Sequence, residues 1–595
     1  MAKNRYDMDE EIKEKGSIKS FGMLFKYLIP QKKVLLTAGC LIVADSFLSL
    51  INPYFIKIAI DDYIPQKNIF GIIVLAILLL IASFGIWVLS RRRTYLTHNM
   101  AMDVIRNIRS DLYAHMQHLP FSFFDSRPHG KILVRVVNYV NTLTSVLANG
   151  LLAIIMDLFK MAIILVFMFS MNVEFTLICL AGVPVFVVAL VFLRSMHKKA
   201  WDEYSQKQGN LNAYLQESIA GIKITQSFAR EEVNANIFDG LCDDNRKKWL
   251  KAKYIATGIP RVVNILSIIV SLAIYVIGFY KMKQGVMQVG LIIAFVSYVS
   301  NFWNPIIQLT NIYNEIVNCA VYLERIFDMI NEPLVVDDEE KAEVLGEVNG
   351  DVEFIDVVFK YEENSPVILD KINFSVKKGE TIALVGPTGA GKSTIINLIS
   401  RFYNLNGGKI LIDGKDISKV TLNSLRKNMG IMLQESFLFS GTIMDNIRYS
   451  KLDATDEEVI NAAKAVCAHD FISELPDGYN TEVREGGNGL SVGQKQLIAF
   501  ARTLLCDPKI LILDEATSSI DTETEIELQK GLERLLKGRT SFIIAHRLST
   551  IKNSSRIMYI ADKNIKEQGT HDELLEKEGY YYNLYMAQYK FLEEM

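Results

Sequence analysis

The residues best suited to chemistry lie in a glycine-rich run in the second half of the chain. It fits the pattern G-x-x-x-x-G-K-[ST] and comprises Gly386, Pro387, Thr388, Gly389, Ala390, Gly391, Lys392, Ser393 and Thr394. Glycines allow successive backbone N–H groups to curl around phosphate oxygens. The run predicts a phosphate-binding loop, in which Lys392 reaches the β- and γ-phosphates of a nucleotide and Ser393 binds Mg²⁺.

The residues on either side of this loop match the structural context that it needs. An apolar run at 381–386 predicts a strand before the loop, and Ile395 to Leu398 open a helix after it. The N-terminus of that helix adds the positive end of its dipole to the loop N–H groups. This context makes a chance match improbable.

A second candidate for chemistry is the carboxylate pair Asp514 and Glu515, which ends an apolar run at 510–514. A buried strand would deliver both acids to the sheet edge beside the phosphates. We expect Asp514 to hold Mg²⁺ through water, and Glu515 to orient the attacking water, because phosphoryl transfer depends mainly on positioning and charge stabilisation. The alternative for such a pair is the N-terminal cap of a helix.

The elements that position these residues predict an α/β domain over residues 350–595. Short apolar runs at 381–386, 510–514 and 540–546 alternate with helical segments, which is typical of a mainly parallel sheet. An acidic stretch at 337–340 lies within a predicted linker, residues 331–349. A different kind of domain must precede it.

The composition indicates a protein with one part in the membrane and another part in water. Of 595 residues, 50% are hydrophobic and 22% are charged, and the mean hydropathy is +0.19. The formal net charge of -3 disfavours a nucleic-acid binder, which would carry a basic surface. The six cysteines lack CxxC or CxxH spacing, so neither a zinc site nor a disulfide framework is indicated.

Six apolar stretches are long enough to cross about 30 Å of hydrocarbon, which takes roughly 20 helical residues. They predict an all-α membrane domain over residues 34–330. The predicted spans are 34–60, 69–90, 144–170, 173–193, 259–280 and 289–312.

The distribution of lysine and arginine predicts the orientation of these spans. Residues 1–33, 91–143 and 194–258 hold 8, 8 and 11 of them, whereas 61–68, 171–174 and 281–288 hold 1, 0 and 2. Basic loops stay on the cytoplasmic side. We therefore expect a multi-pass protein of the cell membrane with both termini in the cytoplasm.

The two long cytoplasmic connections are predicted to be helices that continue well beyond the bilayer, because their apolar residues recur at heptad-like spacing. Each connection turns at a glycine- or proline-containing stretch, near 123–131 and 217–228. Within the N-terminal region 1–33, apolar residues at helical spacing between lysines predict an interfacial elbow helix.

Further motifs then give a resemblance to the ATP-binding cassette family, over essentially the whole chain. It is similar to half-size exporters, in which six spans are fused to one nucleotide-binding domain. By this resemblance Tyr361 stacks on adenine, Gln434 senses Mg²⁺, and His546 is the switch histidine at the γ-phosphate. Leu490 to Gln494 match the signature motif, with Ser491, Gly493 and Gln494 at the nucleotide, and Asp521 matches the D-loop aspartate.

The resemblance implies that two cassettes enclose two ATP molecules, so that this chain needs a partner half-transporter. It also implies an ATPase in which Glu515, His546 and Gln434 are catalytic, and in which Ser393, Gln434 and Asp514 serve Mg²⁺. The turn near 123–131 should contact the cassettes, and the turn near 221–228 should reach the partner's cassette. Nucleic acid is not an expected partner.

Val492 is the departure from the family pattern, because it stands where the signature usually has glycine. It could weaken one of two ATP sites. By analogy with related heterodimers we favour a heterodimer, in which this chain supplies the competent catalytic residues, and a homodimer remains the alternative.

The expected function is ATP-driven efflux of amphipathic or hydrophobic compounds by alternating access. The alternatives are a lipid or peptide exporter on the same scaffold, an ATP-gated channel, and a soluble ATPase of the DNA-repair type, which the six spans disfavour. By its family position the last span should line the cavity. Fixed polar groups in the spans are Asp45, Asp157, Lys160, Asn301, Trp303, Asn304, Gln308, Asn311 and Asn314.

Overall fold

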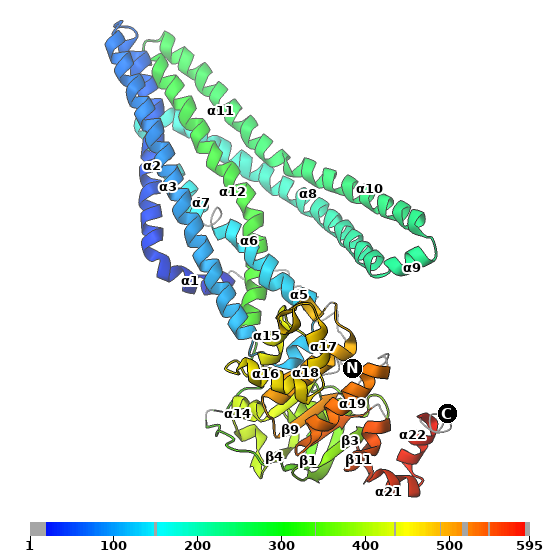
Figure 1. Cartoon of the computed structure of the whole chain (residues 1–595). Coiled ribbons are helices and arrows are strands. Elements are labelled where there is room, and N and C mark those ends of the chain that lie inside the picture. Colours follow the sequence, from blue (N-terminus) through cyan, green and yellow to red (C-terminus); the bar gives the residue numbers. More distant parts are fainter. Residues whose placement is uncertain are drawn as a thin grey trace. The chain divides into compact units, whose positions relative to one another are not determined.

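The computed structural model describes residues 19–147, 152–339, 341–432, 436–487, 489–514, 522–545 and 548–588. Its contacts divide the chain into two compact units (Figure 1). The helical unit comprises the described residues within 12–115 and 130–331, and the α/β unit comprises those within 116–129 and 332–595. Residues 116–129, which fall within the predicted membrane domain, belong to the α/β unit.

The helical unit is built from long helices joined by short turns. Its helices are α1 (Lys19–Leu28), α2 (Lys32–Ile58), α3 (Ile69–Met116), α5 (His129–Val134), α6 (Val140–Ser145), α7 (Leu152–Met171), α8 (Val173–Ala220), α9 (Ile222–Ser227), α10 (Glu231–Ala256), α11 (Gly258–Lys283) and α12 (Val289–Ile330). A helix, α1, forms in the region where the elbow helix is predicted, with Leu24 and Leu28 buried and Phe25 exposed.

The longest helices exceed the thickness of a bilayer. Helices α3 and α8 have 48 residues each, and at a rise of 1.5 Å per residue each extends about 72 Å, against about 30 Å of hydrocarbon. Helix α10 packs along α8, and the short helix α9 closes the turn between them (Figure 1). The lengths of α3 and α8 therefore agree with the prediction that the helices of these connections continue well beyond the bilayer.

The predicted spans coincide with helices. Within the described residues five helical stretches are long and apolar enough to cross a membrane: Gly22–Tyr63, Ile69–Met116, Val173–Ala220, Glu231–Lys283 and Val289–Leu309. The span predicted at 144–170 corresponds to α7, which has 20 residues and begins at Leu152. Residues 148–151, just before it, lie outside the described residues.

The core of the helical unit contains Trp303, which the sequence analysis grouped with cavity-lining polar residues. Its side chain is 1% exposed and packs edge-on against Phe186 and Phe302. A Cβ at Gly182 would lie 2.9 Å from the Trp303 ring, so this glycine lets α8 approach α12 closely. Trp303 is thus a packing residue of this unit.

The other polar residues of the spans differ in their surroundings. Asp45 of α2 forms an ion pair with Arg93 of α3, with 3.3 Å between Nη1 and Oδ2. On α12, Asn304 and Gln308 are exposed. The side chains of Asn311 and Asn314 lie outside the description. The Asp45–Arg93 ion pair joins α2 to α3. An unpaired charge within a membrane span would be costly.

The α/β unit contains a six-stranded sheet in the order β12-β11-β3-β10-β9-β6. Its strands are β3 (Thr381–Val385), β6 (Met429–Met432), β9 (Ile510–Asp514), β10 (Thr540–Ile544), β11 (Arg556–Ala561) and β12 (Asn564–Gly569). All neighbours are parallel except β11 and β12. The predicted mainly parallel sheet is confirmed, with β3, β9 and β10 formed by the three predicted apolar runs.

Helices cover both faces of this sheet, which explains why its central strands β3, β9 and β10 are almost continuously apolar. In β9, Leu511 and Leu513 belong to one hydrophobic cluster, whereas Ile510 and Ile512 belong to another. The helices are α13 (Lys392–Ile399), α14 (Leu422–Lys427), α15 (Ile443–Arg448), α16 (Asp456–Ala465), α17 (His469–Glu474), α18 (Val492–Leu505), α19 (Thr522–Leu536), α20 (Leu548–Lys552), α21 (His571–Glu576) and α22 (Tyr580–Gln588).

Three smaller parts complete the α/β unit. An antiparallel sheet has the order β2-β1-β4-β5, with strands Leu369–Val376, Val352–Phe359, Gly407–Ile412 and Lys415–Asp416. Two short strands, β7 (Gly441–Thr442) and β8 (Glu482–Val483), pair with each other. Helix α4 (Phe121–Asp125) comes from the turn that follows α3 in the chain. The sequence analysis did not predict the antiparallel sheet.

Candidate nucleotide site

The phosphate-binding loop connects β3 to α13, as predicted. Gly386 and Gly391 have φ angles of 141° and 106°, a region that favours glycine. A Cβ at Gly386 would lie 2.2 Å from the carbonyl oxygen of Ile560 in the neighbouring strand β11. These two glycines therefore permit the tight path of the loop, and larger residues would displace it.

The surface of the loop is open to a ligand. Pro387, Thr388 and Gly389 are exposed, and Ala390 is partly buried beside the start of α13. Ser393 is also exposed in the first turn of that helix. The loop thus presents backbone and a hydroxyl group at a helix N-terminus, an arrangement that suits phosphate oxygens and a magnesium ion.

Lys392 lies over the loop that it is predicted to serve. Its Nζ donates hydrogen bonds to the carbonyl oxygens of Gly386 and Pro387, at 2.8 and 2.9 Å. Burial lowers the pKa of Lys392, and the nearby Asp514 carboxylate opposes this effect. The lysine and Asp514, which ends β9, therefore lie in one electrostatic environment, as the sequence analysis expected.

Tyr361 lies beside the P-loop helix. Its hydroxyl is 3.0 Å from Oγ1 of the buried Thr394 in α13. The Tyr361 ring makes edge contacts with Phe359 and Tyr403, at centroid distances of 4.9 and 5.1 Å. The structure therefore brings the predicted adenine-binding aromatic and the phosphate loop together, although they are far apart in sequence.

Four predicted site residues lie outside the described residues: Gln434, Glu515, Asp521 and His546. The strands that precede three of them in the chain are β6, β9 and β10, and these run parallel with β3. The carboxyl ends of parallel strands meet at one edge of a sheet, where open α/β sheets bind ligands. The described strands therefore converge on the edge that carries the phosphate loop.

The signature residues form the N-terminus of α18. Ser491 caps the helix: its hydroxyl accepts a hydrogen bond from the backbone N–H of Gln494, and the Gln494 side chain accepts one from the N–H of Ser491. Gly493 is buried behind this cap. Reciprocal capping keeps the helix N-terminus rigid, with its positive dipole end available to an anion.

Val492 occupies the first position of α18 with its side chain 54% exposed. It is not among the residues with positive φ, so its backbone does not need glycine. The departure from the family pattern is therefore compatible with the fold of this chain. Any effect of Val492 must therefore act on a molecule that contacts the exposed N-terminus of α18.

Helix α4 docks on the α/β unit through residues that the sequence analysis did not single out. The Phe121 ring packs 4.2 Å from the ring of Phe402, and the Tyr403 hydroxyl donates to the Asp125 carboxylate. Arg127 pairs with Glu332 at 3.2 Å. The predicted contact of the turn near 123–131 with the cassette is confirmed. No local sequence signal identified Tyr403, because its partner lies 278 positions away.

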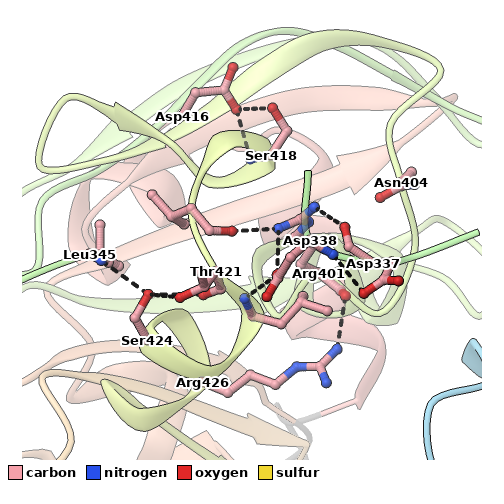
Figure 2. Close-up of polar contacts among 12 residues, drawn as sticks. Asp337, Asp338, Leu345, Arg401, Asn404, Asp416, Ser418, Thr421, Ser424 and Arg426 are labelled. Carbon is pink, nitrogen blue, oxygen red and sulfur yellow. Dashed lines mark hydrogen bonds and ion pairs between the residues drawn. The ribbon is translucent and has the colours of Figure 1, made fainter. Parts of the chain in front are cut away.

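Arg401, which precedes these aromatic residues, is 4% exposed and binds the linker (Figure 2). Its guanidinium donates to the carbonyl oxygens of Val420 and Asp337, at 2.7 and 2.8 Å, and lies 4.0 Å from the Asp338 carboxylate. Arg426 in turn donates to the Arg401 carbonyl at 3.1 Å. Arg401 thus attaches the acidic stretch of the predicted linker to the segment that follows α13.

We expect Arg401→Ala to destabilise the protein, because it removes two hydrogen bonds of a buried guanidinium and leaves the carbonyl oxygen of the buried Val420 without its donor. Hydrogen bonds to a charged group contribute about 1.5–3 kcal/mol each, so the loss of both lowers the free energy of unfolding by about 3–5 kcal/mol and the apparent Tm of a domain of this size by roughly 10 °C. Thermal unfolding of the purified full-length protein measures this change. Lys427→Ala removes an exposed cation nearby and should leave Tm nearly unchanged. Equal Tm values for both variants would contradict the assigned role.

Comparisons with known proteins agree with both units. Residues 35–306 match the protein family described as "ABC transporter transmembrane region", and residues 369–518 match the family described as "ABC transporter". An uncharacterized ABC transporter ATP-binding protein of Bacillus subtilis (strain 168), YknV, is 38% identical over 590 residues, covering 98% of this chain and 97% of the relative.

Two further comparisons concern exporters. An ATP-dependent lipid A-core flippase of Desulfotalea psychrophila is 35% identical over 566 residues, covering 95% of this chain and 98% of the flippase. A solved structure of a bacterial Atm1-family ABC exporter with ATP bound has a TM-score of 0.79 and 28% identity, covering 94% of this chain and 98% of that chain. These similarities extend over both units.

Proposed function

This chain belongs to the ABC transporter family and couples ATP hydrolysis to transmembrane transport, and we propose that it exports amphipathic or hydrophobic compounds across the cytoplasmic membrane by alternating access. The observation that carries the proposal is the phosphate loop in the same chain as the long apolar helices. Hydrolysis would then drive a rigid-body change that alternates the face to which the membrane domain opens.

At the ATP site, the residues present fit a nucleotide and its magnesium ion. Gly386 and Gly391 allow the tight path of the loop, because a Cβ at either position would clash with neighbouring protein atoms, and the loop leaves Thr388, Gly389 and Ser393 exposed to a ligand. Lys392 would turn from the loop carbonyls to the β- and γ-phosphates. Ser393, Asp514 and Gln434 would hold the ion, which neutralises charge on the phosphates when bound. Glu515 would orient the attacking water, and His546 would contact the γ-phosphate.

The amphipathic character of the cargo is supported by two features. Helix α12 keeps Asn304 and Gln308 exposed among apolar side chains, and amides beside apolar surface can bind a guest with both polar and apolar parts. The Desulfotalea relative is named as a lipid flippase. A lipid-like molecule or an amphipathic drug would present the same chemistry to this surface.

The proposal is tested by transport into inside-out vesicles that contain the assembled transporter. We expect ATP to drive uptake of a fluorescent amphiphile and a headgroup-labelled lipid to different extents, and the preferred compound to stimulate ATP hydrolysis. ADP is the control nucleotide. Uptake that proceeds equally fast with ADP would contradict ATP-driven export.

The functional unit is proposed to be a dimer, and a heterodimer is favoured over a homodimer. Val492 exposes a branched side chain at the N-terminus of α18, where the partner's nucleotide would approach. Such a site would be impaired, whereas the P-loop, Glu515 and His546 of this chain would serve the competent site. Robust ATPase activity from a homogeneous homodimer of this chain would contradict the heterodimer.

The turn at α9 is proposed to contact the partner's cassette. The apolar residues Ile224 and Phe228 are highly exposed at this turn. Exposed apolar side chains that lie together are typical of a surface that binds another protein. On the α/β unit, Phe437, Phe439 and Tyr449 form an exposed aromatic patch around Arg502. A corresponding patch on the partner would cover the α9 turn.

We expect Phe228→Ala to lower the rate of ATP-driven transport about ten-fold while ATP binding persists, because the turn loses its largest apolar contact. The measurement is vesicle transport alongside ATP binding. Tyr254→Ala on α10 removes an equally exposed aromatic residue away from the turn and is the matched control. Equal transport by the two variants would contradict the proposed contact.

A further inference from the structure

Tyr403 connects helix α4 to the nucleotide site within the α/β unit. Its side chain is buried, and its hydroxyl donates to the Asp125 carboxylate. A hydrogen bond to an ionised acceptor is stronger than one between neutral groups. Burial, reinforced by this carboxylate, raises the pKa of Tyr403 well above its usual range. Tyr403 therefore stays protonated and keeps donating to Asp125.

The ring of Tyr403 also determines the surroundings of Tyr361. The two rings meet edge to face, with centroids 5.1 Å apart and planes at 87°. Phe359 makes edge contacts with both, at 4.9 Å to Tyr361 and 5.8 Å to Tyr403. Edge-to-face packing is directional, so three mutually packed rings resist reorientation of any one of them.

The opposite end of Tyr361 is held by the P-loop helix. Its hydroxyl lies 3.0 Å from Oγ1 of Thr394 in α13. With its hydroxyl bound to α13 and its ring edge against Tyr403, the Tyr361 ring has one preferred plane. Asp125, Tyr403, Tyr361 and Thr394 thus form a continuous series of contacts from α4 to the phosphate loop.

Other contacts attach α4 without reaching Tyr361. The Phe121 ring packs on Phe402, which also has the Arg426 guanidinium 5.3 Å from its ring centroid. Arg127 pairs with Glu332 at the start of the linker. These contacts can fix the position of α4, whereas the Asp125 contact continues to the ring that is proposed to stack on adenine.

We propose that Asp125 and Tyr403 are positioning residues for ATP, which hold the Tyr361 ring in the plane that stacks on the adenine base. The turn that follows α3 thereby helps to set the affinity of its own cassette for ATP. This inference rests on the proposed role of Tyr361 at adenine. It assigns no direct contact with the nucleotide to either Asp125 or Tyr403.

The test is steady-state ATP hydrolysis by the reconstituted, assembled transporter, with KM and kcat measured separately. Asp125→Ala and Tyr403→Phe should each raise the KM for ATP about five-fold, with kcat little changed, because one hydrogen bond of ordinary strength is lost. Asp125→Asn retains an acceptor for the Tyr403 hydroxyl and should keep the KM within about two-fold of wild type. Failure of this rescue would contradict positioning through the hydrogen bond.

Two further variants separate positioning from a general loosening of α4. Glu332→Gln weakens the other polar attachment of α4 and should leave the KM unchanged. In a Tyr361→Ala background, Asp125→Ala should cause no further rise in KM, since its effect passes through Tyr361. An equal rise with Glu332→Gln, or an additive effect in the double variant, would overturn the inference.

The same measurements distinguish this inference from the proposed site. If Tyr361→Ala leaves the KM for ATP unchanged, the adenine role of Tyr361 is wrong and the inference falls with it. If Tyr361→Ala raises the KM but Asp125→Ala does not, the site stands and only the positioning role of Asp125 is overturned.

Discussion

Lys392→Ala is expected to lower the ATPase rate of the assembled transporter at least about 100-fold and to weaken ATP binding. In the structure the Lys392 ammonium group lies over the phosphate loop, bonded to the carbonyl oxygens of Gly386 and Pro387. A positive charge that is desolvated and aimed at phosphates stabilises charge far more than an exposed one does. Alanine removes this charge while leaving the helix intact, because alanine is a strong helix former.

The measurement is phosphate release at saturating ATP, together with equilibrium binding of a fluorescent ATP analogue. Lys378→Ala is the matched control, because Lys378 is exposed in the turn before β3. Its ATPase rate should remain within about two-fold of wild type. Unchanged ATP affinity in Lys392→Ala would contradict the assignment of residues 386–394 as the phosphate loop.

Glu515→Gln is expected to have an effect of similar size, with a different signature. The amide keeps the shape of the side chain but loses the charge that would polarise the attacking water, so hydrolysis should fall about 100- to 1,000-fold while ATP still binds. Glu515 follows Asp514, the last residue of β9, and the substitution leaves the sequence of the phosphate loop unchanged. Nucleotide should therefore remain trapped as ATP, and ATP-driven transport should stop.

Retention of unhydrolysed ATP after rapid desalting distinguishes this variant from Lys392→Ala, which should retain little nucleotide. Glu533→Gln, an exposed substitution on α19, is the control for the loss of a carboxylate. Wild-type rates of hydrolysis and transport by Glu515→Gln would show that another group orients the water. In a heterodimer with one competent site, Glu515→Gln in this chain alone should be enough to stop hydrolysis and transport.

Several features were predictable from the sequence because their signals are local. The phosphate loop needs glycines at Gly386 and Gly391, and their spacing from Lys392 follows from the loop geometry itself. The apolar runs that became β3, β9 and β10 are buried on both faces, and such strands are apolar throughout. The membrane spans are predictable for a similar reason, since hydrocarbon imposes both length and polarity on each helix.

Other features depend on contacts between distant parts of the chain, and no local pattern encodes them. Trp303 was grouped with the cavity residues by its polar neighbours, yet its environment is set by Gly182 and Phe186 on another helix. Asp45 finds its counter-ion, Arg93, on α3. A side chain on a long helix can face lipid, cavity or core, and only packing decides between them.

The sequence by itself predicted the residues of the nucleotide site and determined the strands and spans, because these depend on short-range geometry and on the surrounding solvent. The tertiary structure decided how that site is attached to the rest of the chain: it placed α4 on the α/β unit, bonded Asp125 to Tyr403, and packed Tyr403 against Tyr361. The physical reason is that edge-to-face rings and single hydrogen bonds between remote residues depend on the closure of long loops, which leaves no periodicity in sequence.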